Sequence, residues 1–139
     1  GIAHDEGYIY VANTGSARRA IEWFSLSAIV NAEEIFDAEN AAGEHTLVSG
    51  LQNVTNITLA ADNYLYFAYA LGTRGVVGRV DPNLCREQGG CTAENVEIVL
   101  YSELAAPLAG LTISPDMKMY VHSIFSPDIY SLQIGEPPS

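Results

Sequence analysis

Residues 56–68 read NITLAADNYLYFA, and similar stretches are GIAHDEGYIYVA at 1–12 and GLTISPDMKMYVH at 110–122. In each copy a short apolar segment meets an acidic turn, and a second segment with a tyrosine follows. These tyrosines lie about 55 residues apart, at Tyr10, Tyr66 and Tyr120. Self-similarity at a regular period indicates a repeat architecture. The sequence therefore predicts the inner two strands of a β-propeller blade, three times over.

The outer strands of the first two blades are predicted from further apolar segments of strand length. The first blade covers about residues 1–50, and the second covers about residues 51–104. Segments that give each of them a third and a fourth strand lie at residues 20–26, 45–48, 75–80 and 96–101.

The third blade, at about residues 105–139, is predicted to be incomplete. It has a third strand at residues 128–134, and no fourth strand follows. The expected fold is therefore all-β, with about three four-stranded blades of a six-bladed propeller. Unpaired sheet edges favour association. We therefore expect this chain to associate either with the remaining blades of the propeller or with a second copy of itself that closes the ring.

The charge balance excludes several kinds of partner. With 6 Lys and Arg against 17 Asp and Glu, the formal net charge is −11. The negative phosphates of nucleic acids and anionic membranes repel such a surface, so neither is an expected partner. No apolar run is long enough to span a bilayer, so no transmembrane segment is predicted.

The two cysteines, Cys85 and Cys91, enclose a short segment that contains two glycines. This spacing allows a local disulfide, with two free thiols as the alternative. A metal site would need further soft ligands, and a catalytic thiol would need a nearby base; the segment has neither. A disulfide would indicate an oxidising compartment, and hence a secreted protein.

Two glycosylation sequons are consistent with secretion. They are Asn53-Val54-Thr55 and Asn56-Ile57-Thr58, and Asn53 is the candidate for modification. The protein is therefore expected to be a secreted glycoprotein.

Three segments, in order along the chain, resemble the paraoxonase/arylesterase family. The first is VANT at residues 11–14 with IEWF at residues 21–24, and the second is LQNVTNI at residues 51–57. The third is GLTISPD at residues 110–116 with the strand MYV that follows. The resemblance implies a six-bladed propeller that hydrolyses lactones and aryl esters, with two calcium ions in its central tunnel. There, calcium polarises the substrate carbonyl and a histidine pair activates water.

Several catalytic positions of that family are substituted in this chain. The first histidine of the pair would precede Gly1, and the second falls on Thr14. Two asparagines that bind the catalytic calcium fall on Thr55 and Ala109, and alanine offers no side-chain oxygen. The catalytic residues are therefore unknown.

The resemblance also implies ligands for the buried structural calcium. A carboxylate of the family falls on Asn56, and a backbone carbonyl falls on Ile2. The expected metal ligands in this chain are therefore Asn56, Thr55 and the carbonyl of Ile2, with calcium as the cofactor.

The recurring polar residues are predicted to have structural roles. Aspartates in turns hydrogen bond their own backbone, which explains Asp5, Asp62 and Asp116 better than metal binding does. His4 and His122 are expected to make ordinary hydrogen bonds rather than to line a tunnel, and His45 is expected to be solvated. Strand aromatics are expected to pack between blades: Tyr8, Tyr10, Tyr64, Tyr66, Tyr120 and Trp23.

Two classes of function follow from these observations. One is part of a secreted paraoxonase-like hydrolase that acts on lactones or aryl esters. The other is a non-catalytic binding or structural propeller that has lost the calcium and histidine site. A related sugar-lactonase or strictosidine-synthase-like propeller is a further alternative.

Overall fold

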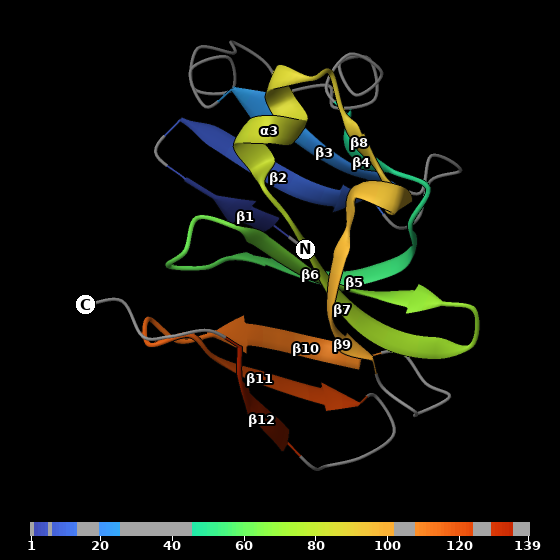
Figure 1. Ribbon diagram of the computed structural model, residues 1–139, viewed down its shortest axis with the longest axis vertical. Coiled ribbons are helices and arrows are strands. Elements are labelled where there is room, and N and C mark those ends of the chain that lie inside the picture. Colours follow the sequence, from blue (N-terminus) through green and yellow to red (C-terminus); the bar gives the residue numbers. More distant parts are fainter. Residues whose placement is uncertain are drawn as a thin grey trace, which may run out of the picture.

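The computed structural model describes residues 2–5, 7–13, 20–25, 46–101, 108–123 and 129–134. Their secondary structure is mostly β, in three sheets that follow one another along the longest axis (Figure 1). No helix in these ranges is long and apolar enough to cross a membrane. We call the sheets one, two and three in chain order.

Sheet one contains the first repeated hairpin and has the strand order β1-β2-β3-β4-β8. Its strands from the N-terminal part are β1 (Ile2–His4), β2 (Tyr8–Asn13), β3 (Ala20–Ser25) and β4 (Thr46–Ser49). These four strands pair antiparallel in sequence order. The four strands predicted for the first blade are therefore confirmed within a residue or two.

Sheet two is an antiparallel sheet with the order β5-β6-β7-β9. Its strands are β5 (Gln52–Leu59), β6 (Leu65–Leu71), β7 (Arg74–Val80) and β9 (Glu97–Tyr101). Sheet three has the order β10-β11-β12, from β10 (Leu108–Ile113), β11 (Lys118–Ser123) and β12 (Ile129–Gln133). The strands predicted for these two units are also confirmed.

The insert between β7 and β9 differs from the prediction, because it joins another sheet. It consists of α3 (Pro82–Glu87), β8 (Cys91–Thr92) and the 3₁₀ turn η1 (Ala93–Asn95). Strand β8 pairs in parallel with β4, with Val48 opposite Cys91. Sheet one therefore has five strands rather than four, and its outer edge is covered by chain from the second unit.

Local chemistry fixes the shape of this insert. Asp81 caps α3 by accepting a hydrogen bond from the amide of Asn83 at 3.0 Å, and Pro82 begins the helix. The disulfide predicted between Cys85 and Cys91 is present, with their Cα atoms 5.1 Å apart. It joins the end of α3 to β8 and so holds the strand near its partner.

Two apolar layers separate the three sheets, and β6 contributes to both. Because neighbouring strand residues point to opposite faces, Phe67 packs in the layer with sheet one, whereas Tyr66 and Ala68 pack in the layer with sheet three. This sharing explains why six of the seven β6 residues are buried. A strand covered on both faces needs a continuous apolar run, which the sequence LYFAYA supplies.

The first strands of the three sheets lie beside one another. β5 contacts both β1 and β10, and Figure 1 shows the three in the middle part of the molecule. This line of first strands contains the residues that the sequence predicts as metal ligands.

Candidate functional site

The candidate site is the line where β5 meets β1 and β10. Two side chains of β5 reach across to β10. The hydroxyl of Thr55 donates to the backbone carbonyl of Leu108, and Asn56 Nδ2 donates to the carbonyl of Leu111 at 3.3 Å. Both side chains therefore connect sheet two to sheet three.

An irregularity in β5 accompanies these contacts. The pairing of β5 with β6 shifts register between Gln52 and Asn56, and Asn53 has a left-handed φ of 50°. Bulges of this kind bend a strand and change the direction of its side chains. Here two consecutive residues, Thr55 and Asn56, both reach β10, which a regular strand with alternating side chains would not allow.

Oxygen atoms are the kind of ligand that calcium prefers, but the predicted ligands in this chain supply too few of them. Asn56 Oδ1 accepts no hydrogen bond from a described residue, and Ile2 is exposed on the neighbouring β1. No polar contact among the described residues joins the Ile2 carbonyl to Asn56. Calcium takes six to eight oxygen ligands, usually with carboxylates among them. The neutral oxygens of Ile2, Thr55 and Asn56 therefore do not make a calcium site by themselves.

The described residues also contain no cluster of three or more histidine, cysteine, aspartate or glutamate side chains that could hold a metal ion. Thr14 and His45 lie outside the described residues. Ala109 lies in β10, but only its backbone is described. His4 is exposed on β1, and His122 lines a shallow hollow on sheet three together with Tyr120.

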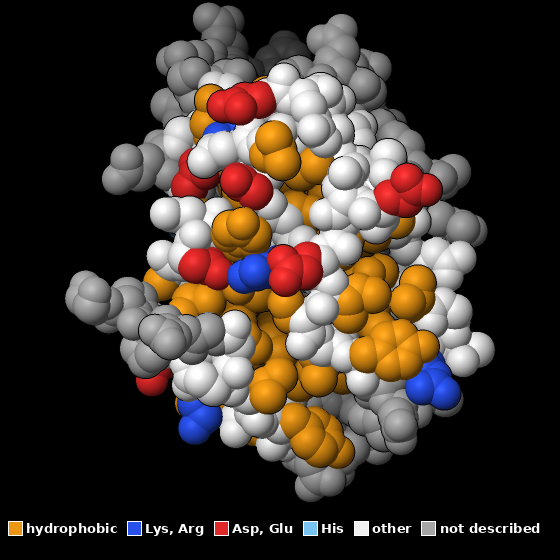
Figure 2. Space-filling view, viewed as in Figure 1, with side chains coloured by type: hydrophobic (Ala, Val, Ile, Leu, Met, Phe, Trp, Pro, Cys, Tyr) orange, Lys and Arg blue, Asp and Glu red, His pale blue; other side chains and the backbone are white. Residues whose placement is uncertain are grey.

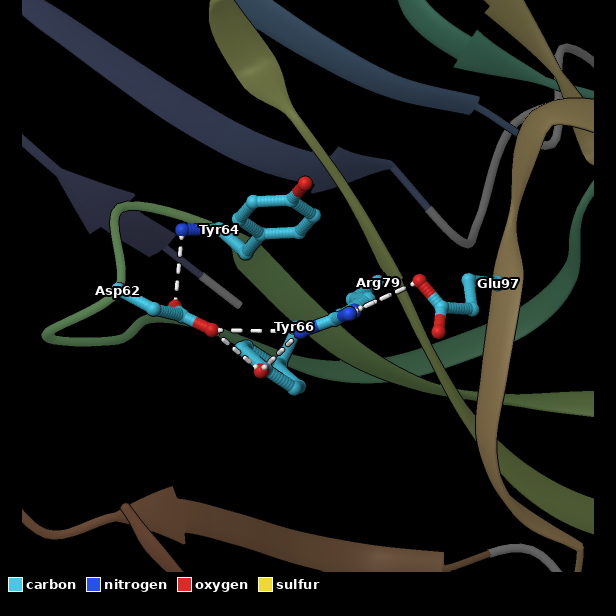
Figure 3. Close-up of polar contacts among 5 residues, drawn as sticks. All are labelled: Asp62, Tyr64, Tyr66, Arg79 and Glu97. Carbon is cyan, nitrogen blue, oxygen red and sulfur yellow. Dashed lines mark hydrogen bonds and ion pairs between the residues drawn. The ribbon is translucent and has the colours of Figure 1, made fainter. Parts of the chain in front are cut away.

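A polar cluster on sheet two surrounds the repeated tyrosine (Figure 3). The Tyr66 hydroxyl donates to Asp62 Oδ2 at 2.7 Å, and Arg79 Nη1 donates to the same hydroxyl at 3.1 Å. Asp62 Oδ1 accepts from the amide of Tyr64 at 3.0 Å, as expected for a turn aspartate. Arg79 also forms an ion pair with Glu97 at 2.9 Å and lies over the Tyr64 ring.

These contacts keep Tyr66 neutral. Burial and the hydrogen bond to Asp62 raise the pKa of Tyr66 to about 12, against the opposing effect of Arg79. Burial lowers the pKa of Arg79, but its bonds to Tyr66 and Glu97 outweigh that effect and raise it above its usual value. Arg79 therefore stays charged, and Tyr66 keeps its proton near neutral pH.

Sheet one carries a related cluster around Tyr10. The Tyr10 hydroxyl donates to Asp5 Oδ2 at 2.9 Å, and Asp5 Oδ1 accepts from the amides of Gly7 and Tyr8. The cation is Arg86, which donates to the Tyr10 hydroxyl and lies 3.9 Å from the centre of the Tyr8 ring. Since Arg86 belongs to α3, this contact ties the insert of the second unit to sheet one.

The pKa of Tyr10 is raised, like that of Tyr66 in sheet two. Burial and the bond to Asp5 raise the pKa of Tyr10 far above its usual value. Burial raises the pKa of Asp5, but hydrogen bonds from Gly7, Tyr10 and Tyr8, with Arg86 nearby, outweigh it and lower that pKa. A neutral phenol beside a carboxylate is a stable structural arrangement.

The third tyrosine differs from the prediction. Tyr120 is 36% exposed, whereas Tyr10 and Tyr66 are fully buried between sheets as expected. Asp116 accepts from the hydroxyl of Ser114 and has no bond to Tyr120 among the described contacts. The tyrosine of sheet three therefore lies at the surface and not between two sheets.

The arginines of these clusters lie outside the repeated stretches of the sequence. The contact of Arg79 with Tyr66 could have been predicted from the β6–β7 hairpin, because the two residues lie directly opposite each other in its register. The contact of Arg86 with Tyr10 could not have been predicted in this way, because the two residues are 76 positions apart in the sequence.

Comparison with protein-family models, with curated proteins and with solved structures finds no match for this chain. The resemblance to the paraoxonase/arylesterase family therefore stays a prediction from the residues.

Proposed function

We propose that this chain forms three consecutive blades of a β-propeller within a secreted, paraoxonase-like hydrolase of lactones or aryl esters. The arrangement of the sheets supports the proposal. Three largely antiparallel sheets follow in chain order, and β5 lies against both β1 and β10. In a propeller the first strands line the central channel, where a ligand has access to several blades.

The observation that carries the proposal is the position of Asn56. It lies on β5 at the line of first strands, with its amide nitrogen held by the Leu111 carbonyl at 3.3 Å. This bond fixes the orientation of the Asn56 amide and leaves its Oδ1 atom available to accept a hydrogen bond or to coordinate a cation. The described residues do not complete a calcium site, so the test of the proposal measures turnover both with and without calcium.

Hydrolysis of phenyl acetate and of δ-valerolactone tests the proposal. The full chain should turn over at least one of them above the buffer rate, and Asn56→Ala should reduce the rate. Asn53→Gly is the matched control, because it removes an exposed amide from the same strand and glycine accepts its φ of 50°. No turnover with or without millimolar calcium, or equal loss in both variants, would contradict the proposal.

A non-catalytic binding or structural propeller is the second candidate, and one observation favours it. Thr55 and Asn56 both donate to carbonyls of β10, so they act as connections between sheets. In this case Asn56→Ala lowers the melting temperature, while calcium and chelator leave the melting of the unaltered chain unchanged. A melting temperature that rises with calcium argues for the hydrolase instead.

Secretion is part of the same proposal and rests on the Cys85–Cys91 disulfide. Asn53 is exposed and is the proposed glycan site. Peptide mass mapping of protein from a secreting eukaryotic host tests it, because an unmodified Asn53 there would contradict the glycan.

A further inference from the structure

A hollow of about 450 Å³ lies between sheet two and the insert, beside the N-terminal end of β5. Its walls include Gln52 of β5, Tyr69 and Leu71 of β6, and Ala93, Val96 and Ile98 from the insert and β9. None of its lining residues is charged. Its volume falls in the range of roughly 300–1,000 Å³ that small-molecule sites occupy. Figure 2 shows hydrophobic side chains gathered over this part of the molecule.

Tyr69 places one polar group at the wall of the hollow. The residue is only 5% exposed, and its hydroxyl makes no hydrogen bond with the described residues. Every fully buried side-chain oxygen among those residues has a partner. The hydroxyl is therefore not fully buried, and the residue that carries it lines the hollow.

The position of the Tyr69 ring is fixed by its neighbours. Its centroid lies 5.5 Å from that of Phe67. A Cβ atom at Gly78 would lie only 3.1 Å from Tyr69 Cε1 and would also collide with Val96. The absence of a side chain at Gly78 thus gives the ring and Val96 the space that they occupy.

The opposite wall is fixed as well. Ala93 and Val96 follow β8, which is paired with β4 and joined to α3 through the Cys85–Cys91 disulfide. The hollow is therefore bounded by a strand of sheet two and by a braced insert. Such a site is largely formed before a ligand arrives, which lowers the entropic cost of binding.

We propose that this hollow binds a small, neutral, largely apolar molecule that accepts a hydrogen bond from Tyr69 through a carbonyl oxygen. The apolar walls favour a hydrocarbon body, and the Tyr69 hydroxyl supplies one oriented donor. A charged ligand is disfavoured, since none of the lining residues could compensate its loss of water. Burial raises the pKa of Tyr69, so the hydroxyl keeps its proton in physiological conditions. This proposal concerns binding and does not rest on the proposed hydrolase activity.

Titration with cyclohexanone, followed by amide chemical shifts, tests the proposal. The shifts should saturate and should centre on the residues that line the hollow. Hexanoate, which has a similar size but carries a charge, should produce no saturable shifts at these residues. Shift changes centred elsewhere, or binding of hexanoate at least as strong, would overturn the proposal.

Tyr69→Phe removes the donor and keeps the ring. It should weaken cyclohexanone binding roughly two- to tenfold, as expected for one neutral hydrogen bond. Tyr101→Phe is the control, because Tyr101 is exposed and is not among the lining residues. Unchanged affinity in a folded Tyr69→Phe variant would overturn the role of the hydroxyl.

Ala93→Phe gives an independent test that leaves Tyr69 in place. Ala93 is exposed at the rim, so a larger side chain there should fill the hollow without entering the core. Binding should be lost while the spectrum of sheets one and three is kept. Unchanged binding in this variant would place the ligand elsewhere.

Discussion

Tyr66 and Tyr120 occupy the same place in the repeat, but the structure treats them differently. Each follows an aspartate by four residues, Asp62 and Asp116. Tyr66 is fully buried and bonded to Asp62, whereas Tyr120 is 36% exposed. Across the sheet, Tyr66 faces Arg79 but Tyr120 faces Ser131. Tyr120 also has a cation nearby, because Lys118 Nζ lies 5.9 Å from the centre of its ring. An acidic turn and a nearby cation are therefore not sufficient, and the buried form has in addition an arginine bonded to its hydroxyl and a second sheet over its ring.

Tyr10 shows that the cation can come from elsewhere. Its cross-strand partner is Trp23, so β3 offers no arginine at this position. Arg86 of α3 takes that place from the second unit. The Asp–Tyr hydrogen bond is common to sheets one and two, and only the source of the cation differs.

Truncation of the two tyrosines should separate them most clearly. Tyr66→Ala removes a fully buried ring from between sheets two and three, and should cost about 3–5 kcal/mol of unfolding free energy. Tyr120→Ala should cost less than about 1 kcal/mol, because much of its ring is already in solvent. Urea unfolding of both variants measures the difference. Equal losses would mean that Tyr120 is buried in solution.

Removal of the cation in sheet one should have the next largest effect. Arg86→Ala leaves Tyr10 without its donor and breaks a contact between sheet one and the insert. A loss of about 1–3 kcal/mol is expected, as for a hydrogen bond that involves a charged group. Arg74→Ala is the control, since Arg74 is exposed and only lies over the Tyr101 ring. If both variants unfold at the same urea concentration, Arg86 contributes no such tie.

High pH should destabilise the fold through the buried tyrosines. The pKa of Tyr66 in the folded chain is about 12, above the value of about 10 for an unfolded tyrosine. Its contribution to stability is therefore complete below about pH 10 and is lost as the pH rises towards 12. Tyr66→Phe should reduce this alkaline loss relative to the unaltered chain. Melting temperatures from pH 8 to 11 compare the two, and identical curves would contradict the assignment.

The smallest expected effect comes from adding an arginine across the strand from the tyrosine of sheet three, where Lys118 already lies over the ring. Ser131→Arg places an arginine opposite Tyr120, as Arg79 lies opposite Tyr66. At an exposed position the gain should be no more than about 0.5–1 kcal/mol. Thermal unfolding at low and high salt measures it, with Ile129→Arg as the control, since Ile129 is exposed and lies two residues before Ser131 on β12. A gain as large as the loss in Arg86→Ala would mean that the covering sheet is unnecessary.

Local sequence patterns predict most of the strands but not the contacts between distant residues. Alternation and turn chemistry place both strands of each hairpin, including β6, where the continuous apolar run reflects burial on two faces. Strand β8 has only two residues, and its partner Val48 lies in another unit, so no local pattern could reveal it. The pairing of β8 with β4 can be recognised only in the folded structure.

The same limit applies to the candidate site. The resemblance directs attention to Thr55 and Asn56, and the structure places both on the line of first strands. Their bonds to Leu108 and Leu111 span more than 50 residues, so the sequence does not predict them. Tyr69 gives no sign in the sequence either, because its unpaired hydroxyl depends on Gly78 and on the path of the insert.

The pairing of β8 with β4 also affects how the chain opens. Sheet one can lose its outer edge only if the insert of sheet two is displaced, and the disulfide resists that movement. Sheets one and two should therefore open as one cooperative unit, while sheet three, which has no such exchange of strands in the described chain, opens at lower free energy. Amide protons of β11 would then exchange with solvent through openings that leave β2 and β6 protected.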